Sequence, residues 1–265
     1  MGLDKSNLRG FLLFLLVFSI FPGCSRDKDD ALTRIRNTGE IRAAMSADYP
    51  PFNYLDKDGN LQGFDVDVTR ELARRLGVTP KIVVKKWSLI IKGLLAGEYD
   101  IISGSMAISD ERKSLVAFSI PYYHSIVRAV VRKDFPLKEI SDLKGKTLGI
   151  GAGSNYENDA RELGVTDIRS FEPWSKGLLA LQEGSIDAVI VDQIVGINAL
   201  AFGKHEIQFL GGSLRREAVA IAVRKEDKNL LKAIDKALAS MQKDGFLADL
   251  GKKVAQCEYD CSGRF

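Results

Sequence analysis

The sequence predicts an α/β fold made of two similar units, and two observations support this prediction. Apolar segments of strand length alternate with amphipathic helical segments, the order typical of parallel sheets with crossover helices. The same order then occurs a second time. Both copies share one local pattern, at residues 95–102 and 182–189: a helix ending at glycine, two residues, an aspartate and an apolar strand. We therefore expect two α/β units with a cleft between them.

The first unit contains three expected strands and two expected helices. The strands are at 40–45, 81–84 and 99–102, and the helices are at 64–76 and 89–96. In the first helix, apolar residues recur every four positions and the periodicity stops at Gly77, a typical helix end. A turn is expected at 57–60, where Asp58 and Gly59 follow each other.

The second unit repeats this order. We expect strands at 147–151, 168–171 and 188–191, and helices at 155–163 and 175–183. Gly164 and Gly184 follow the two helices. Beyond this unit the pattern predicts one more strand at 218–223 and an amphipathic helix at 229–242.

The first residues predict export and not a folded element. Lys5 and Arg9 precede an apolar run at 11–21 that is too short to span a bilayer and is typical of a signal peptide. Cys24 follows Gly23 and precedes a charged segment, as in a bacterial lipobox. We expect residues 1–23 to be a signal peptide, Cys24 to carry lipid and residues 24–34 to form a tether. The alternative is ordinary signal cleavage nearby, which leaves Cys24 as a free thiol; in both cases the protein is exported.

Cysteine content and charge narrow the function classes. Without Cys24, the cysteines form one pair, Cys257 and Cys261, which we expect to be a disulfide in an oxidising compartment. A zinc site needs more ligands at suitable spacing, so no metal and no cofactor is expected. The net charge of +3 is small against 38 basic and 35 acidic residues, which are interspersed, so a nucleic-acid partner is not expected.

The segment 100–123 is the most informative part of the chain. An apolar strand is followed by small polar residues and by Ser109 and Asp110, which are good helix caps. Ser105 and Arg112 flank this helix start, so hydroxyl, amide and guanidinium donors converge there on one carboxylate. The alternative for such a pair is a buried strand followed by a solvated arginine.

This segment resembles the ligand-carboxylate loop of the family 3 extracellular solute-binding proteins, the amino-acid receptors of ABC importers. The resemblance covers roughly residues 35–256 and includes Trp87 and the segments 48–52, 63–67, 118–123 and 143–146. It implies a two-lobed periplasmic-binding-protein (Venus flytrap) fold, with two parallel-rich sheets flanked by helices and a hinge of two chain crossings. Lobe 1 is then expected at 35–125 and 215–265, and lobe 2 at 126–214.

The resemblance also implies a site for an amino-acid zwitterion. Arg112, Ser105 and the amide of Ala107 take the ligand carboxylate; Ala107 stands where many relatives have a hydroxyl residue. Ser154 and Asn155 add donors from the second lobe, and Asp192 takes the ligand ammonium. An alternative for Asp192 is a helix cap. Tyr49 or Phe52, together with Trp87, hold the ligand side chain, although Trp87 is alternatively a core residue below the cleft.

The implied role is the solute-binding component of an ABC importer, which delivers an amino acid to a membrane permease. The protein is expected to be a lipid-anchored monomer outside the cytoplasmic membrane. Relatives that bind basic amino acids often have an acid at position 46, so Ser46 favours a neutral ligand. Two alternatives remain open. One is a periplasmic cyclohexadienyl dehydratase on the same fold, with Asp192 or Glu157 as general acid, and the other is a sensory protein acting in trans.

Overall fold

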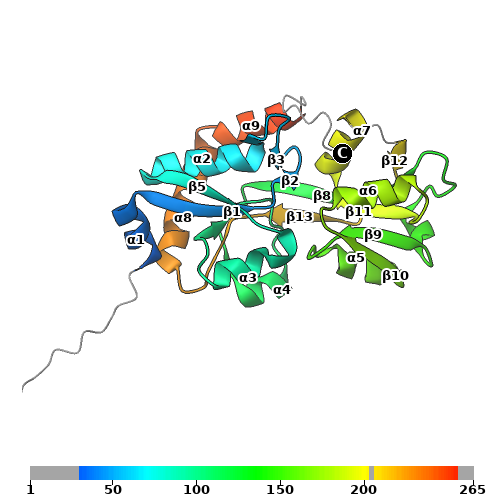
Figure 1. Ribbon diagram of the computed structural model, residues 1–265, viewed down its shortest axis with the longest axis horizontal. Coiled ribbons are helices and arrows are strands. Elements are labelled where there is room, and N and C mark those ends of the chain that lie inside the picture. The colour runs from blue at the N-terminus through cyan, green and yellow to red at the C-terminus, as the bar shows by residue number, and fades with distance from the viewer. Residues whose placement is uncertain (1–29, 203–205, 256–265) are drawn as a thin grey trace, which may run out of the picture.

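The computed structural model describes residues 30–202 and 206–255, and its two main sheets follow one another along the long axis of the molecule (Figure 1). We call each main sheet with the helices that cover it a lobe. The expected signal peptide, the expected lipidation site Cys24 and the expected disulfide Cys257–Cys261 lie outside the described residues.

The first lobe contains a five-stranded sheet with the order β5-β1-β6-β14-β7. β1 is parallel to β5 and β6, whereas β14 is antiparallel to β6 and β7. The strands are β1 (Glu40–Met45), β5 (Thr79–Val84), β6 (Ile101–Ile102), β7 (Ala117–Phe118) and β14 (Ala222–Val223). A small second sheet joins β2 (Asp48–Tyr49), β3 (Asn53–Leu55) and β4 (Leu61–Gln62).

Helices cover the first sheet and bury its apolar side chains. They are α1 (Ala31–Thr38), α2 (Phe64–Leu76), α3 (Ile90–Leu95), α4 (Asp110–Leu115), α8 (Lys228–Lys243) and α9 (Phe246–Ala255), with a 3-10 turn η1 (Trp87–Leu89) before α3. α2 packs on β5, α8 and α9, and α1 packs on β1 and α8. The helix expected at 229–242 is therefore part of the first lobe, because α8 contributes its buried face to the core that α1 and α2 share.

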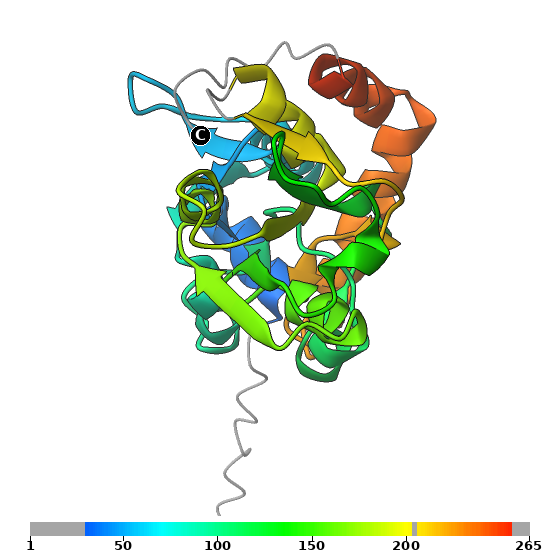
Figure 2. The ribbon, with the colours of Figure 1, turned by 90° about the vertical axis from the view of Figure 1, so that its right-hand side faces the viewer.

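The second lobe contains a sheet with the order β10-β9-β11-β8-β12, in which β13 also pairs with β8. The strands are β8 (Tyr123–Arg132), β9 (Thr147–Gly151), β10 (Asp167–Phe171), β11 (Ala188–Asp192), β12 (Ile207–Phe209) and β13 (Arg215–Val219). The helices are α5 (Tyr156–Glu162), α6 (Ser175–Gln182), α7 (Gln193–Phe202) and the 3-10 turn η2 (Ile140–Leu143). α5 lies on one side of the sheet and α7 on the other (Figures 1 and 2).

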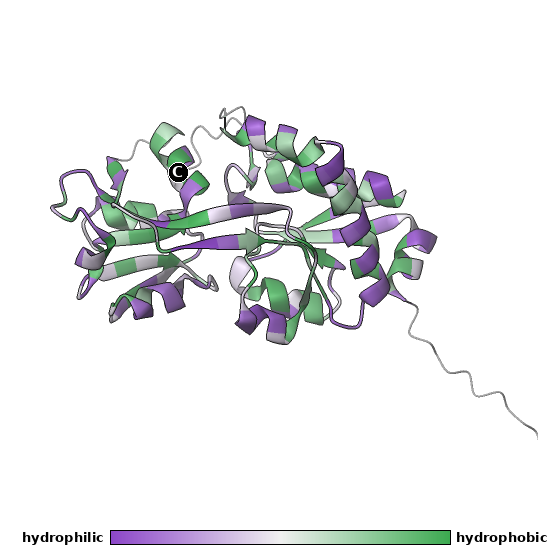
Figure 3. Ribbon diagram, turned by 180° about the vertical axis from the view of Figure 1, so that it is seen from behind, coloured by the Kyte–Doolittle hydropathy of each residue, from purple (hydrophilic) through white to green (hydrophobic). Residues whose placement is uncertain are grey.

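Hydropathy follows this layering. Strands of both sheets are largely hydrophobic, and the exposed faces of the helices are hydrophilic (Figure 3). β11 is buried at every position because helices cover both of its faces. Within the described ranges, no helix is both long enough and apolar enough to cross a membrane.

The chain crosses between the lobes twice, and this corrects two expectations. The strand expected at 218–223 is two strands, because β13 pairs with β8 in the second sheet and β14 pairs with β6 and β7 in the first. Residues 220–221 make this crossing, and residues 119–122 make the other. The expected lobe boundaries placed 215–219 and 123–125 in the first lobe, whereas the structure pairs these residues with each other in the second sheet.

The segment expected as a tether is also shorter than residues 24–34. Ala31–Thr38 form α1, and Asp30 caps this helix by accepting a hydrogen bond from the Thr33 amide. Arg34 forms an ion pair of 2.6 Å with Asp100, which is fully buried. Residues 31–34 therefore belong to the folded lobe because they bury apolar surface and a charged contact.

The carboxylate of Asp65, in the first turn of α2, ties together three segments that approach the cleft. It accepts hydrogen bonds from Tyr122 Oη (2.6 Å), Ser105 Oγ (2.7 Å) and Asn53 Nδ2 (2.7 Å), and it is fully buried. Asn53 Oδ1 in turn accepts the amide of Ala47. Ser105 and Ala47 both have positive φ, at 58° and 61°, which is uncommon for residues other than glycine. The network therefore holds two strained loop positions in place.

We predict that Asp65→Asn destabilises the ligand-free protein by about 1–3 kcal/mol or more. An asparagine offers one acceptor oxygen where the carboxylate offers two, so at least one of the three buried donors loses its partner. The measurement is the free energy of unfolding from urea denaturation. Asp67→Asn is the matched control, since Asp67 lies on the same helix and its 30% exposed side chain pairs with Arg70. Equal losses in the two variants would contradict this account.

Candidate functional site

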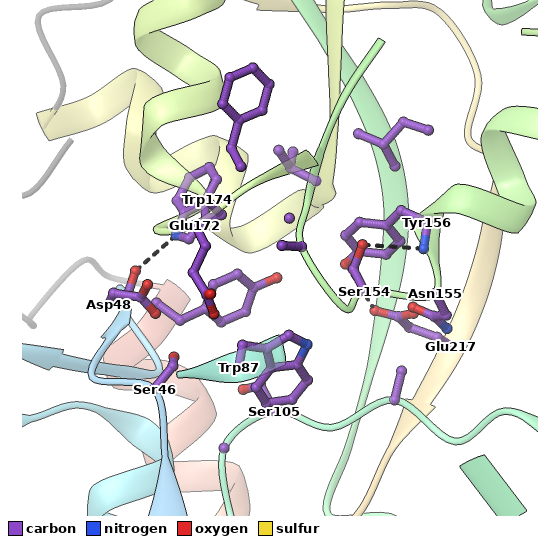
Figure 4. A pocket seen from close by; sticks show the side chains of 18 of the residues that line it. Ser46, Asp48, Trp87, Ser105, Ser154, Asn155, Tyr156, Glu172, Trp174 and Glu217 are labelled. Atoms are coloured by element: carbon purple, nitrogen blue, oxygen red, sulfur yellow. Dashed lines mark hydrogen bonds between the residues drawn. The ribbon is translucent and has the colours of Figure 1, made fainter. Parts of the chain in front are cut away.

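A cavity lies between the two lobes, and both lobes contribute to its wall (Figure 4). It offers about 80 Å³ to the centre of a water-sized sphere. A single water needs roughly 10–15 Å³ on the same measure, so the cavity has room for a small molecule. It is lined by Ser46, Asp48, Tyr49, Trp87, Gly104, Ser105, Ala107 and Arg112 of the first lobe and by Gly151, Ala152, Ser154, Asn155, Tyr156, Phe171, Glu172, Trp174, Ile190, Val191 and Glu217 of the second.

Direct hydrogen bonds join the lobes around this cavity. Trp174 Nε1 donates to the carbonyl oxygen of Asp48 at 2.8 Å. The amide and hydroxyl of Ser88 donate to the carboxylate of Glu172 at 3.1 and 2.8 Å. Arg112 Nη2 donates to the carbonyl oxygen of Gly153 at 3.3 Å. Each bond joins the first lobe to the second, so the structure has a closed cleft.

Arg112 places a buried positive charge at one end of the cavity. Ser109 caps α4 by accepting the Arg112 amide, which fixes the side chain at the helix start. The residue is 7% exposed, and its guanidinium lies 5.5 Å from the Trp87 ring centre and donates to the carbonyl oxygen of Ala107 at 2.9 Å. In the described part of the chain, no carboxylate oxygen lies within 4.0 Å of it.

Burial lowers the pKa of Arg112, while the charge of Glu217 acts in the opposite direction. A guanidinium stays protonated in proteins even so. A buried cation that lacks a carboxylate is costly unless a bound anion completes it. This end of the cavity is therefore suited to an anionic group.

Ser105 and Ala107 lie beside Arg112, as expected, but with different capacities. The Ser105 hydroxyl already donates to Asp65, so its oxygen is left as an acceptor. The Ala107 side chain supplies no polar group, and among the described residues its amide has no hydrogen-bond acceptor. Ser154 Oγ accepts the Tyr156 amide at 3.4 Å, and both Ser154 and Asn155 line the cavity on the side of Tyr156 and Glu217 (Figure 4).

Aromatic side chains form much of the wall, and the sequence did not indicate three of them, Tyr156, Phe171 and Trp174. Tyr49 and Trp87 line the cavity. Phe52 does not line it: it is 1% exposed and stacks beneath Tyr49, with ring centres 5.9 Å apart. Trp174 completes the wall, edge-on to Tyr49 at 5.9 Å. Its place just after a strand of the second unit was the only signal in the sequence that could have indicated it.

Asp192 ends β11, but it is 1% exposed and does not line the cavity. Its Oδ1 accepts the amides of Ile194 (2.7 Å) and Val195 (3.4 Å), so it caps α7, which is the alternative that the sequence left open. Burial raises the pKa of Asp192 to about 7, and the nearby charge of Glu217 contributes to the rise.

Glu217, on β13, is a cavity residue that sequence reasoning missed. Its Oε2 accepts Arg215 Nη1 at 2.9 Å, and Tyr156 Oη donates to its Oε1 at 3.4 Å. Arg215 also holds Asp159 through two hydrogen bonds, of 2.7 and 3.0 Å. Burial raises the pKa of Glu217, and the charge of Arg215 opposes this. Residues 215–219 are three charged residues followed by Ala218 and Val219, so no alternation in the sequence indicates which of these side chains faces the cavity.

The remaining sequence candidates are not in the cavity. Glu157, one of the two acids considered for a dehydratase, has a 47% exposed side chain that pairs with Arg161 on the surface of α5. Within residues 30–202 and 206–255, no group of three or more His, Cys, Asp or Glu side chains is arranged to hold a metal ion.

Comparison with known proteins gives consistent matches over most of the chain. The profile of the bacterial extracellular solute-binding proteins, family 3, matches residues 41–256. The L-cystine-binding protein TcyJ of Escherichia coli is 32% identical over 254 residues, which cover 95% of each protein. The structure of holo ArgBP from T. maritima has a TM-score of 0.76 at 36% identity and covers 83% of this chain and 97% of that one.

A third relative bears on the enzyme alternative. The ancestral amino acid-binding protein AncCDT-1, a precursor of cyclohexadienyl dehydratase, has a TM-score of 0.78 at 32% identity and covers 84% of this chain and 98% of that one. TcyJ and AncCDT-1 are described as binding proteins, and ArgBP is described in its holo form. None of the three is described as an enzyme.

We predict that Asp192 makes stability fall as pH rises from about 4 to about 7. Its carboxyl releases its proton near pH 3.9 in an unfolded chain and near pH 7 in the folded protein. The folded state therefore gains stability from this proton below about pH 4 and has lost it above about pH 7, a change of roughly 4 kcal/mol. Asp192→Asn keeps a capping side chain without the titration. The measurement is the difference in unfolding free energy between the two proteins in urea at each pH; a difference independent of pH would contradict the prediction.

Proposed function

The chain belongs to the bacterial extracellular solute-binding proteins of family 3, and from this premise we propose that it binds an amino acid between its lobes as the solute-binding component of an ABC importer. The observation that carries the proposal is the buried guanidinium of Arg112, which lines the cavity between the lobes without a carboxylate partner in the described structure. An α-carboxylate is the group that completes it with a pair of parallel hydrogen bonds.

In this proposal the ligand carboxylate lies against Arg112 and the free amide of Ala107. Ser154 and Asn155 reach the same end from the second lobe, so the carboxylate touches both lobes. Ser105 has its hydroxyl proton committed to Asp65, and its oxygen is thus better suited to accept from the ligand ammonium.

For the ammonium we propose the side of the cavity lined by Glu217, with Asp192 behind the wall. Asp192 caps α7 through Oδ1 and does not line the cavity, so it acts on the ammonium through its charge. Glu217 lines the cavity directly and shares its charge with Arg215. A cation placed between two buried carboxylates lowers the free energy of both charges, which lowers their pKa values toward the ordinary range. The ligand side chain then lies between the rings of Tyr49 and Trp87, with Trp174 beside them.

Closure of the lobes is the mechanical part of the proposal. The two lobes rotate against each other about the two crossings, at 119–122 and 220–221. Residues 123–125 and 215–219 move with the second lobe, because they pair with each other in its sheet. A ligand that contacts both lobes favours the closed form, because it interacts differently with the two arrangements. One chain builds the whole cavity, so we propose a monomer.

The dehydratase alternative has less support. Of the two acids that it required, Glu157 is on the surface of α5 and Asp192 caps a helix behind the cavity wall. A general acid must lie within hydrogen-bond reach of the group it protonates. The matched relatives are binding proteins, and we therefore propose that the chain is not an enzyme.

We also propose that residues 1–23 are a signal peptide and that Cys24 carries lipid, which anchors the protein outside the cytoplasmic membrane beside the permease. The support is the sequence pattern around Gly23 and Cys24, together with a family whose members are extracellular. Because α1 begins at Ala31, the tether is at most residues 24–30.

We predict that Arg112→Ala weakens binding of the preferred amino acid by over about a hundredfold, or roughly 3 kcal/mol, because the ligand carboxylate loses its charged partner. The measurement is titration calorimetry over the twenty amino acids, followed by the variant. Lys113→Ala is the control, since Lys113 lies on the same helix but is exposed and pairs with Asp110.

The ligand-free Arg112→Ala protein should not melt below wild type, because the variant removes a buried charge without a carboxylate partner. Unchanged affinity in Arg112→Ala, or the failure of all twenty amino acids to bind wild type, would show that this account of the site is wrong.

We predict that Cys24→Ala releases the protein from membranes. The lipid is attached through the Cys24 sulfur, so alanine removes the anchor while leaving the lobes intact. Cell fractionation and immunoblotting measure the membrane-bound share. Cys257→Ser serves as the control, since it removes a cysteine outside the lipobox; retention of the Cys24→Ala protein at wild-type levels would disprove the anchor.

A further inference from the structure

The end of the cavity away from Arg112 contains two carboxylates, one from each lobe. Asp48 belongs to β2 in the first lobe, and Glu172 follows β10 in the second. Both line the cavity, and Figure 4 shows them on the opposite side from Ser154, Asn155 and Glu217. The sequence did not indicate either residue as a site residue, because they are far apart in the chain and meet only when the lobes are closed.

Neither carboxylate has a cation of its own in the described part of the chain. No Lys, Arg or His nitrogen there lies within 4.0 Å of Asp48 or Glu172. Glu172 is held by neutral donors only, the amide and hydroxyl of Ser88 across the cleft. Burial raises the pKa of Asp48, and the charge of Glu172 adds to this rise. Closing the cleft therefore brings two like charges together where water is partly excluded.

Two carboxylates alone would be an ordinary solvated patch, but this pair shares the cavity between the lobes with the buried guanidinium of Arg112. Among the charged lining residues, Glu217 is already paired with Arg215, so Arg112 at one end faces Asp48 and Glu172 at the other. An amino acid whose α-ammonium lies beside Glu217 and whose side chain is uncharged satisfies Arg112 and leaves the acidic end uncompensated. The polarity of the cavity thus calls for a molecule that is anionic at one end and cationic at the other.

The wall near the acidic end also suits a cation. Trp174 is fixed there by its hydrogen bond to the Asp48 carbonyl, and Tyr49 lies against it. Indole and phenol rings attract cations through their faces. Trp87 already lies over one cation, the Arg112 guanidinium.

We propose that the ligand carries a second cationic group on its side chain, and that Asp48 and Glu172 hold this group between the lobes. This inference rests on the proposed function and narrows its substrate to amino acids with a distal ammonium, guanidinium or imidazolium. The lack of an acid at Ser46, which favoured a neutral ligand in the sequence, is offset by the acid two residues later and by its partner across the cleft. The distal cation also relieves the repulsion that opposes closure.

The experiment is titration calorimetry on the full mature protein with two sets of probes. Arginine, lysine and histidine can carry a second cationic group; citrulline, norleucine and glutamine are their neutral counterparts of similar size. The variants are Asp48→Asn, Glu172→Gln and the double variant, which keep shape and remove charge. Glu183→Gln is the control, an exposed acid of the second lobe outside the cavity. Melting temperatures without ligand verify that each variant is folded.

The expected result is that the tightest probe comes from the cationic set and exceeds its neutral counterpart by about tenfold or more. In the double variant this preference should fall to about threefold or less, while neutral probes keep their affinity. A neutral probe that binds tightest overturns the inference and leaves the proposed function standing. A cationic preference that survives in the double variant overturns the assignment to Asp48 and Glu172. The absence of binding by every probe overturns the proposed function, and this inference with it.

Discussion

The site depends on one buried carboxylate, that of Asp65. It accepts hydrogen bonds from Asn53, Ser105 and Tyr122, and so connects the start of β3, the loop after β6 and the end of the first crossing. These loops would otherwise have no reason to hold the positive φ of Ala47 and Ser105. The cavity wall of the first lobe is rigid because a charged acceptor, inaccessible to water, has three donors that cannot be satisfied elsewhere.

Some charged side chains around the cavity form ion pairs within the protein, and others have no ion-pair partner among the described residues. Asp159, Arg215 and Glu217 form a chain of ion pairs that stabilises the second lobe. Arg112, Asp48 and Glu172 have no such partners among the described residues, and they lie at the two ends of the same cavity. In the proposed function, these unpaired charges destabilise the empty closed form, so a ligand of matching charge favours closure of the lobes.

Much of the fold and part of the site could be predicted from local pattern. The expected helix at 64–76 matches α2, because its apolar period and its terminal glycine are properties of neighbouring residues. Trp87 and Arg112 were also placed correctly in the cavity wall, since a motif fixes their local geometry. Trp174, Glu172 and Glu217 were missed, because their relation to the cavity depends on how two separate sheets face each other. The sequence could not decide whether Tyr49 or Phe52, three residues apart, lines the cavity. The packing decides it, because the ring of Phe52 stacks beneath that of Tyr49.

The sequence by itself determined the two α/β units and the start of α4 that fixes Arg112, because each follows from the order of residues over one or two elements. Tertiary structure alone decided where the chain changes lobes, dividing an apolar run into β13 and β14, and it alone turned Asp192 into a helix cap behind the wall. It also brought Asp48 and Glu172 to one end of one cavity. Contacts between residues more than a hundred positions apart depend on the pairing of whole sheets, and no local pattern encodes that pairing.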